Sequence, residues 1–178
     1  NDPPRPYVDR GEGLFIILET GEKLFDMTGG WTAHNVLGYS DPDVLEAMRR
    51  QMNRYCHMDM NIWANREQDE LAELMLSRAP SGLDKVYFGG TSGSDAIEAA
   101  MKLSYHVHHD SGQQSKVNYI FREQSFSGAT LQSMSVSDLP ILNFFEPIKP
   151  KNYAIIPEHN PLYFRENDES LDDYAKRS

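Results

Sequence analysis

The 178-residue chain has a single cysteine, Cys56, so no disulfide can form within it. A reducing compartment is the simpler expectation for such a chain. The sequence also contains no Asn-x-Ser/Thr acceptor for N-glycosylation, which agrees with that expectation. We therefore expect a cytoplasmic protein in which Cys56 is a buried structural residue rather than an activated thiol.

Basic charge and long hydrophobic runs are scarce as well. The chain has 17 Lys and Arg residues against 27 Asp and Glu residues, which gives a formal charge of −10. Since a nucleic-acid-binding protein needs a basic face to neutralise phosphates, we expect no nucleic-acid partner. The longest apolar run, residues 13–18, is too short to cross a bilayer, so we expect no membrane partner. The chain does not begin with Met or a signal peptide, and we expect its original start to be missing.

The first part of the chain has the patterns of a hairpin followed by two helices. Residues 13–27 predict a β-hairpin whose turn is supplied by Thr20 and Gly21. Residues 41–52 predict a helix, because Asp41 suits the N-cap position and Pro42 suits the first helical turn. A second helix is expected over residues 67–78.

The middle of the chain has the order strand, helix, strand. Residues 85–88 and 117–121 predict two short strands, and residues 95–106 predict a helix between them. This order is typical of a βαβ unit, and hence of an α/β fold with a parallel sheet. A further helix is expected from about Gly128, after which prolines interrupt the pattern. Residues 169–176 resemble the start of another helix, so we expect the chain to continue further.

The turn between the first strand and its helix carries the most specific chemistry. Ser92 and Asp95 have the S-x-x-D spacing of a capping box, which makes Gly93 and Ser94 the first helical residues. Their backbone N–H groups lack intrahelical partners, and the positive end of the helix dipole favours an anion there. A phosphate site is therefore one interpretation of this turn, and a plain capped helix is the other.

Several ordered motifs resemble one known family. Residues 92–102, SGSDAIEAAMK, resemble the phosphate-binding segment S-G-S-E-A-x-E-x-A-x-K of class III aminotransferases. Residues 125–130, SFSGAT, resemble that family's S-Y/F-H-G-x-T stretch, and residues 30–44 resemble its G-x-W-x-x-N-x-G-H-x-x-P-x-V stretch. The resemblance also includes the hairpin and the helix with Leu71 and Leu74, and covers about residues 8–135.

The resemblance implies a fold type I enzyme that uses pyridoxal 5′-phosphate to move an amino group from an amine or amino acid to a 2-oxo acid. It implies that Gly93 and Ser94 hold the cofactor phosphate and that Phe126 lies flat against the pyridine ring. It also implies that Trp31 sits beside the substrate. Core packing is the alternative interpretation of Phe126 and of Trp31.

Two departures from the family pattern affect the chemistry. Ser127 stands where the family has a histidine. The motif of the pyridine-pairing carboxylate, Asp-Glu-Val-x-x-Gly, is absent, and no lysine stands in the family's Schiff-base pattern. We therefore predict that the 178 residues alone are inactive, and leave open a non-catalytic phosphate-binding fragment or a fragment without a ligand. The lysines are Lys23, Lys85, Lys102, Lys116, Lys149, Lys151 and Lys176.

The resemblance also bears on assembly and domains. It implies an N-terminal part, residues 1–60, followed by the beginning of a cofactor-binding domain over residues 61–178. Residues 28–65 are rich in aromatic and methionine side chains, which is typical of a buried interface. We expect a homodimer with Trp63 in the contact, and a single-domain core is the alternative. The apolar residues concerned are Trp31, Tyr39, Tyr55, Met58, Met60, Ile62 and Trp63.

A histidine cluster, residues 106–109, raises the possibility of a metal site because His106 and His109 are one helical turn apart. Apart from Asp110, no carboxylate or cysteine stands at matching spacing. Histidines at a helix C-terminus also complement the helix dipole. We therefore expect a solvated helix end and no metal.

Overall fold

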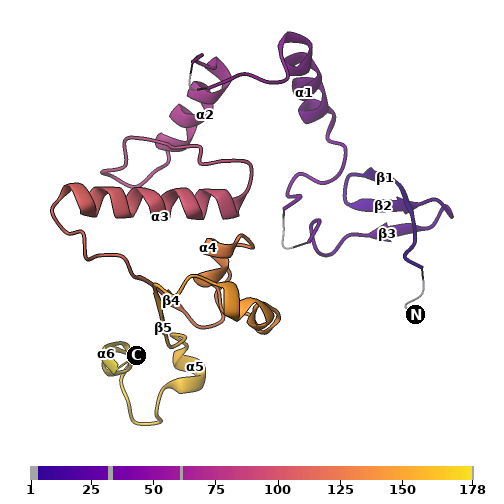
Figure 1. Ribbon diagram of the computed structural model, residues 1–178. Helices are drawn as coiled ribbons and strands as arrows, with labels where there is room; N and C mark the ends of the chain where they lie inside the picture. The colour runs from indigo at the N-terminus through magenta and orange to yellow at the C-terminus, as the bar shows by residue number, and fades with distance from the viewer. Residues whose placement is uncertain (1–3, 32–33, 61, 178) are drawn as a thin grey trace. The chain divides into compact units, whose positions relative to one another are not determined.

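The computed structural model describes residues 4–31, 34–60 and 62–177. The chain divides into two compact units, Asn1–Leu71 and Ala72–Ser178. Figure 1 shows the elements of both units along the chain. The domain division at residue 60 stays a prediction.

The first unit contains a three-stranded antiparallel sheet of β1 (Val8–Glu12), β2 (Phe15–Leu18) and β3 (Lys23–Phe25), in that order. The hairpin predicted over residues 13–27 is therefore confirmed as β2 and β3, and β1 extends it. A loop closes onto this sheet, because Gly13 and Tyr39 exchange backbone hydrogen bonds of 3.0 and 2.6 Å.

Two helices follow the loop. In α1 (Pro42–Arg54), the Asp41 carboxylate accepts hydrogen bonds from the amides of Asp43 and Val44, as the N-cap prediction requires. The second predicted helix is confirmed as α2 (Arg66–Leu76). The Tyr55 hydroxyl donates a 2.9 Å hydrogen bond to Glu67, which ties the end of α1 to the start of α2. The next residue, Cys56, is exposed, so the expectation that it is buried is wrong.

The core of the second unit lies between a helix and a parallel strand pair. Helix α3 (Gly93–Asp110) buries Met101 against Phe121 and Val136. Phe121 belongs to β4 (Tyr119–Arg122), which pairs in parallel with β5 (Tyr153–Ile156). The expected α/β architecture with a parallel sheet is present, although its strands are not the pair that the sequence predicts.

The strand predicted over residues 85–88 is wrong. This segment has no strand partner within the described part of the chain, so no ladder forms. The residue after it, Gly89, lies close against α3: a Cβ on Gly89 would lie 3.2 Å from the Ala96 Cα. The parallel partner of β4 is β5, which the sequence analysis missed because the prolines around it suggested an irregular segment.

The remaining elements are short. The helix expected from about Gly128 is only α4 (Leu131–Ser135), and it is followed by a 3₁₀ helix, η1 (Pro140–Ile148). After β5 come α5 (Pro161–Phe164) and α6 (Leu171–Arg177), and α6 confirms the helix predicted over residues 169–176. No helix of the described residues is both long and apolar enough to span a membrane.

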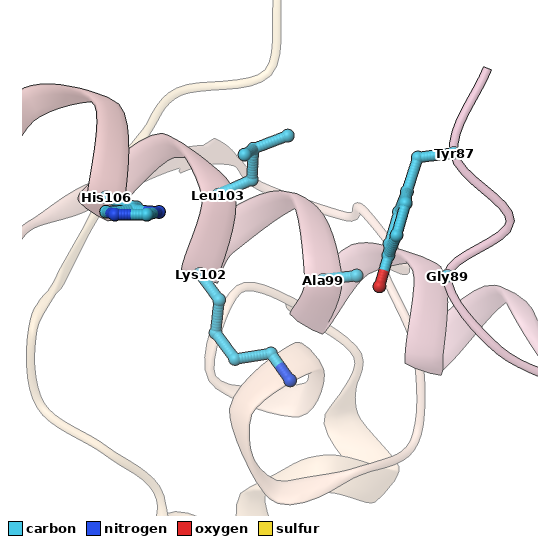
Figure 2. Close-up of a pocket in the computed structure, with 6 residues that line it drawn as sticks. All are labelled: Tyr87, Gly89, Ala99, Lys102, Leu103 and His106. Atoms are coloured by element: carbon cyan, nitrogen blue, oxygen red, sulfur yellow. The ribbon is translucent and has the colours of Figure 1, made fainter. Parts of the chain in front are cut away.

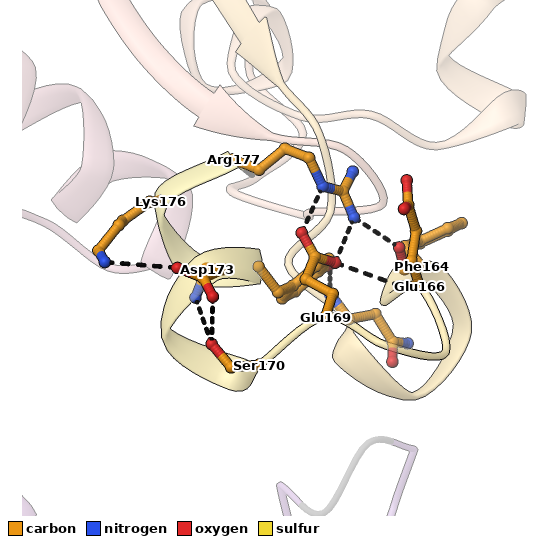
Figure 3. Close-up of polar contacts among 9 residues, drawn as sticks. Phe164, Glu166, Glu169, Ser170, Asp173, Lys176 and Arg177 are labelled. Carbon is orange, nitrogen blue, oxygen red and sulfur yellow. Dashed lines mark hydrogen bonds and ion pairs between the residues drawn. The ribbon is translucent and has the colours of Figure 1, made fainter.

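A set of polar contacts fastens α6 to the chain before it (Figure 3). The Arg177 guanidinium lies 2.7 Å from the Glu169 carboxylate and donates a 3.0 Å hydrogen bond to the Phe164 carbonyl. Arg177 lowers the pKa of Glu169 to about 2. Tyr174 is the buried residue of α6, and its hydroxyl accepts a hydrogen bond from the Asn160 amide. These contacts fold the end of the second unit back on itself.

Candidate functional site

The start of α3 is closed by a complete capping box. The Ser92 hydroxyl accepts a 3.2 Å hydrogen bond from the Asp95 amide, and the Asp95 carboxylate accepts a 3.1 Å hydrogen bond from the Ser92 amide. The hydrogen bond from the Ser92 hydroxyl is the largest cause that lowers the pKa of Asp95. Of the four N-terminal amides, the capping box thus satisfies two. Those of Gly93 and Ser94 have no protein acceptor within the described residues.

The start of α3 also has open space beside its two unpaired amides. A Cβ built on Gly93 meets no atom within 4 Å, so the helix start is open there. The turn before it is tight, because a Cβ on Gly90 would lie 2.5 Å from the Asp95 Cβ, and the φ of Gly90 is +150°. The small residues of this segment therefore form a compact turn that leaves two amide donors accessible.

A second turn, residues 124–130, packs against the first turn of α3. The Ala129 amide donates a 3.0 Å hydrogen bond to the Ser94 hydroxyl oxygen. The neighbouring Gly128 approaches so closely that a Cβ on it would lie 2.7 Å from the same oxygen. The structure thus brings the segment that contains Phe126 to the start of the helix that contains Gly93 and Ser94.

Phe126 is held from both sides of its turn, while its own side chain is 62% exposed. Before it, the Asp138 carboxylate accepts a 3.0 Å hydrogen bond from the Gln124 amide, and the Asp138 backbone amide donates a 2.8 Å bond to the Ser125 carbonyl. After it, the Ser127 amide donates a 2.8 Å hydrogen bond to the Ser137 hydroxyl. The sequence analysis missed these anchors, because a serine or an aspartate after a short helix is a weak signal.

Trp31 belongs to the first unit, in the loop that follows β3. Its side chain is 78% exposed, and its backbone has a φ of +68°, which is unusual for a residue other than glycine. Its amide donates a 3.2 Å hydrogen bond to the Thr28 hydroxyl. The loop thus presents an aromatic side chain from a constrained backbone.

One carboxylate organises the loop before Trp31. Asp26 accepts hydrogen bonds from the amide and hydroxyl of Thr28 at 2.8 and 2.7 Å. It also accepts bonds of 2.7 Å from the Gly30 amide and the Tyr39 hydroxyl. These bonds, those from Thr28 first, hold the pKa of Asp26 well below its usual range. Asp26 also raises the pKa of Tyr39. Sequence reasoning missed this carboxylate, although an Asp two residues before a Thr and a Gly pair is an available turn signal.

A pocket of about 320 Å³ lies along the side of α3, as Figure 2 shows. Lys102 and His106 line it from the helix, and Tyr87 lines it from the preceding segment. Two histidines of α3 lie near a carboxylate at the end of the helix: the Asp110 carboxylate is 3.3 Å from the His106 ring and 3.5 Å from the His109 ring. No group of three or more metal-binding side chains gathers anywhere in residues 4–31, 34–60 and 62–177.

Comparison with solved structures defines the fold. The omega transaminase from Pseudomonas jessenii in complex with PMP superposes with a TM-score of 0.86 at 24% identity, over 97% of this chain and 38% of that chain. The two units therefore form part of fold type I, the fold of pyridoxal-phosphate-dependent transaminases.

Comparison with sequences gives the family. The model of the family "Aminotransferase class-III" matches residues 1–177, and the chain belongs to that family. An uncharacterized aminotransferase from Schizosaccharomyces pombe is 30% identical over 97% of this chain and 37% of its own length. The acetylornithine aminotransferase of Aquifex aeolicus is 32% identical over 86% of this chain and 40% of its own length. The chain thus spans well under half the length of these relatives, and the family implies pyridoxal phosphate as cofactor.

Proposed function

We propose that the complete protein transfers an amino group from an amine or amino acid to a 2-oxo acid, and that this chain supplies part of its cofactor site. The observation that supports this most strongly is the start of α3. There, the amides of Gly93 and Ser94 have no acceptor among the residues that the structure describes, and open space lies over Gly93. An 18-residue helix adds the positive end of its dipole at the same point.

The residues of the site fit a phosphate group. The Gly93 and Ser94 amides would donate to its oxygens, as helix N-termini do in many phosphate sites. The Ser94 hydroxyl oxygen already accepts from Ala129, so its own hydrogen stays available to donate to the phosphate. When bound, pyridoxal phosphate would supply the electron sink for amino transfer.

Two aromatic residues complete the proposed assignment. Phe126 offers an exposed ring beside the start of α3, and an aromatic face suits a planar, electron-poor pyridine ring. Trp31 is assigned to the substrate side, where its exposed indole would limit the size of the amine. Because no lysine of this chain matches the family's Schiff-base pattern, the covalent anchor is assigned to a residue outside the 178.

The Gly93→Val substitution tests the phosphate assignment in the complete protein. The branched side chain would occupy the open space over the helix start and obstruct the anion. We expect the dissociation constant for pyridoxal phosphate to rise about ten- to a hundredfold, as for the loss of charge-assisted hydrogen bonds. The melting temperature without cofactor should not fall, since no described atom beyond the adjoining helix backbone lies within 4 Å of a Cβ there. A wild-type dissociation constant would refute the assignment.

We also propose that the complete protein is a cytoplasmic homodimer. None of the residues of helix α1 is buried. The side chains of Met48 and Met52 on this helix are 56% and 60% exposed. Ile62 and Trp63 are exposed to a similar degree, so apolar surface gathers in this part of the chain. Such surface is typical of an interface between subunits.

The Trp63→Glu substitution tests the dimer. A charged side chain in a desolvated contact is costly, so we expect monomers and a simultaneous loss of cofactor. Sedimentation and cofactor absorbance measure the two effects, and the wild-type melting temperature should rise with protein concentration. A Trp63→Glu protein that remains dimeric and holds its cofactor would contradict the proposal.

A further inference from the structure

Three buried serines lie behind the turn that contains Phe126. Ser133, Ser135 and Ser137 have exposed fractions of 0%, 1% and 2%, so their hydroxyl groups are sealed from water. A buried hydroxyl without a hydrogen-bond partner is costly. Each of these hydroxyl groups has a partner in the protein, and the partners show what each serine holds in place.

The Ser137 hydroxyl joins the turn to the segment behind it. It accepts a 2.8 Å hydrogen bond from the Ser127 amide, directly after Phe126, and donates a 3.0 Å bond to the Ser133 carbonyl. The Ser137 hydroxyl therefore links the backbone of the turn to the backbone of α4 at Ser133. The Ser133 hydroxyl accepts a 3.1 Å bond from the Thr130 amide and so holds the far end of the turn.

We propose that Ser137 is a positioning residue for the cofactor ring: through the Ser127 amide it fixes the backbone of the turn that contains Phe126 and packs against the start of α3. This inference rests on the proposed function, since it takes Phe126 as the residue that lies against the ring. Ser94 fixes the other side of the turn through Ala129. Together, the two hydroxyl groups leave the Phe126 backbone little freedom to move away from the phosphate-binding amides.

The chain contains a matched control for this role. Ser135 is as deeply buried as Ser137 and stands two residues before it. Its hydroxyl donates a 2.6 Å hydrogen bond to the Gln132 carbonyl, in the same helix, and has no bond to the turn. Removing either hydroxyl deletes its hydrogen bond to a backbone carbonyl of α4, but only the loss at Ser137 also leaves the Ser127 amide without its acceptor.

The experiment compares Ser137→Ala, Ser135→Ala and Ser137→Thr in the complete protein. For Ser137→Ala, we expect the dissociation constant for pyridoxal phosphate to rise about three- to tenfold, the scale of one hydrogen bond. The visible circular dichroism of the bound cofactor should fall, because the ring is held less firmly. The affinity for inorganic phosphate, which has no ring, should not change. Ser137→Thr keeps the hydroxyl and should restore both signals, and Ser135→Ala should alter neither.

A double-mutant cycle separates positioning from general stability. If Ser137 acts through Phe126, then Ser137→Ala should have no further effect on cofactor affinity in a Phe126→Ala background. Equal losses from Ser135→Ala and Ser137→Ala, or additive losses in the cycle, would overturn the inference. If Ser137→Ala does not fold, Ser137→Cys supplies the test, because sulfur is a weak acceptor of similar size. Wild-type affinity in that variant would overturn the inference as well.

The outcomes also separate this inference from the proposed function. A wild-type complete protein that binds no pyridoxal phosphate would refute the proposed function itself. A wild-type protein that binds the cofactor, with a Ser137→Ala variant that binds it equally well, would refute only the role of Ser137.

Discussion

The loop around Trp31 and the turn around Phe126 both present an exposed aromatic side chain, yet they are held by different chemistry. In the first, one carboxylate, Asp26, accepts four hydrogen bonds and gathers the whole loop. In the second, the backbone is held by separate groups, among them the Ser94 and Ser137 hydroxyls. One charged carboxylate thus holds the loop that contains Trp31, whereas several groups, most of them neutral, hold the turn that contains Phe126.

This difference has consequences for how each region can fail. Hydrogen bonds to a carboxylate are stronger than bonds between neutral groups, but they all depend on one ionised side chain. In the serine network, removal of one hydroxyl leaves the bonds of the other serines in place, so the geometry of the turn is the more sensitive property. We therefore expect steric changes to disturb the Phe126 turn most, and changes of charge to disturb the Trp31 loop.

The largest effect is expected from a steric change, Gly128→Ala, in the Phe126 turn. The φ of Gly128 is +140°, and an added Cβ would lie 2.4 Å from the Ser133 hydroxyl oxygen. Strain and overpacking together should destabilise the second unit by roughly 1–3 kcal/mol. Thermal unfolding of the complete protein without cofactor measures this effect, and cofactor affinity should fall with it.

Gly93→Ala is the control for that substitution, because an added Cβ meets no atom within 4 Å and the φ of Gly93 is not positive. Its melting temperature without cofactor should equal or slightly exceed that of the wild type, because alanine favours a helix over glycine. If Gly128→Ala were equally harmless, the turn would not be packed against α3 as closely as the structure shows.

The sequence alone predicts the local part of the site well. The S-x-x-D spacing of Ser92 and Asp95 is a local signal, and the structure confirms both hydrogen bonds of the capping box. The helix that starts at Asp41 is predicted for the same reason and is confirmed. Such features depend on residues within one turn of helix, so a single sequence contains all the information needed.

The features that the sequence does not predict depend on residues far apart. The residues that pair β4 with β5 are more than thirty positions apart, and prolines beside β5 hid its apolar pattern. The segment 85–88 has the composition of a strand but no neighbour to pair with in the described part of the chain. Ser137 looks like any polar residue until packing shows that it is buried behind Phe126. In these three cases, contacts with residues distant in sequence, rather than local secondary-structure propensity, determine the structure.

The smallest expected effect is a difference between the two regions in their response to acid. Hydrogen bonds from Thr28, and then from Tyr39, lower the pKa of Asp26 below its ordinary value of 3.8. A carboxylate whose pKa is depressed by folding contributes stability that is complete above the ordinary value and is lost only as the pH falls below it. The Trp31 loop should therefore stay intact down to about pH 4 and open under more acidic conditions. The Ser127 amide, whose acceptor is a neutral hydroxyl, should show no such transition while the protein remains folded.

Amide NMR of the complete protein, with labelled glycine and serine, measures this difference. The Gly30 amide, which donates to Asp26, should shift only well below pH 3.8, whereas the Ser127 amide should keep its position over the same range. In an Asp26→Ala variant, the Gly30 amide should lose the titration and exchange with solvent faster by about tenfold or more, as expected for the loss of a hydrogen bond to a charged group. A Gly30 amide that titrates at or above the ordinary carboxylate value would show that Asp26 does not organise the loop. In that case, the strained backbone of Trp31 would need another source of support.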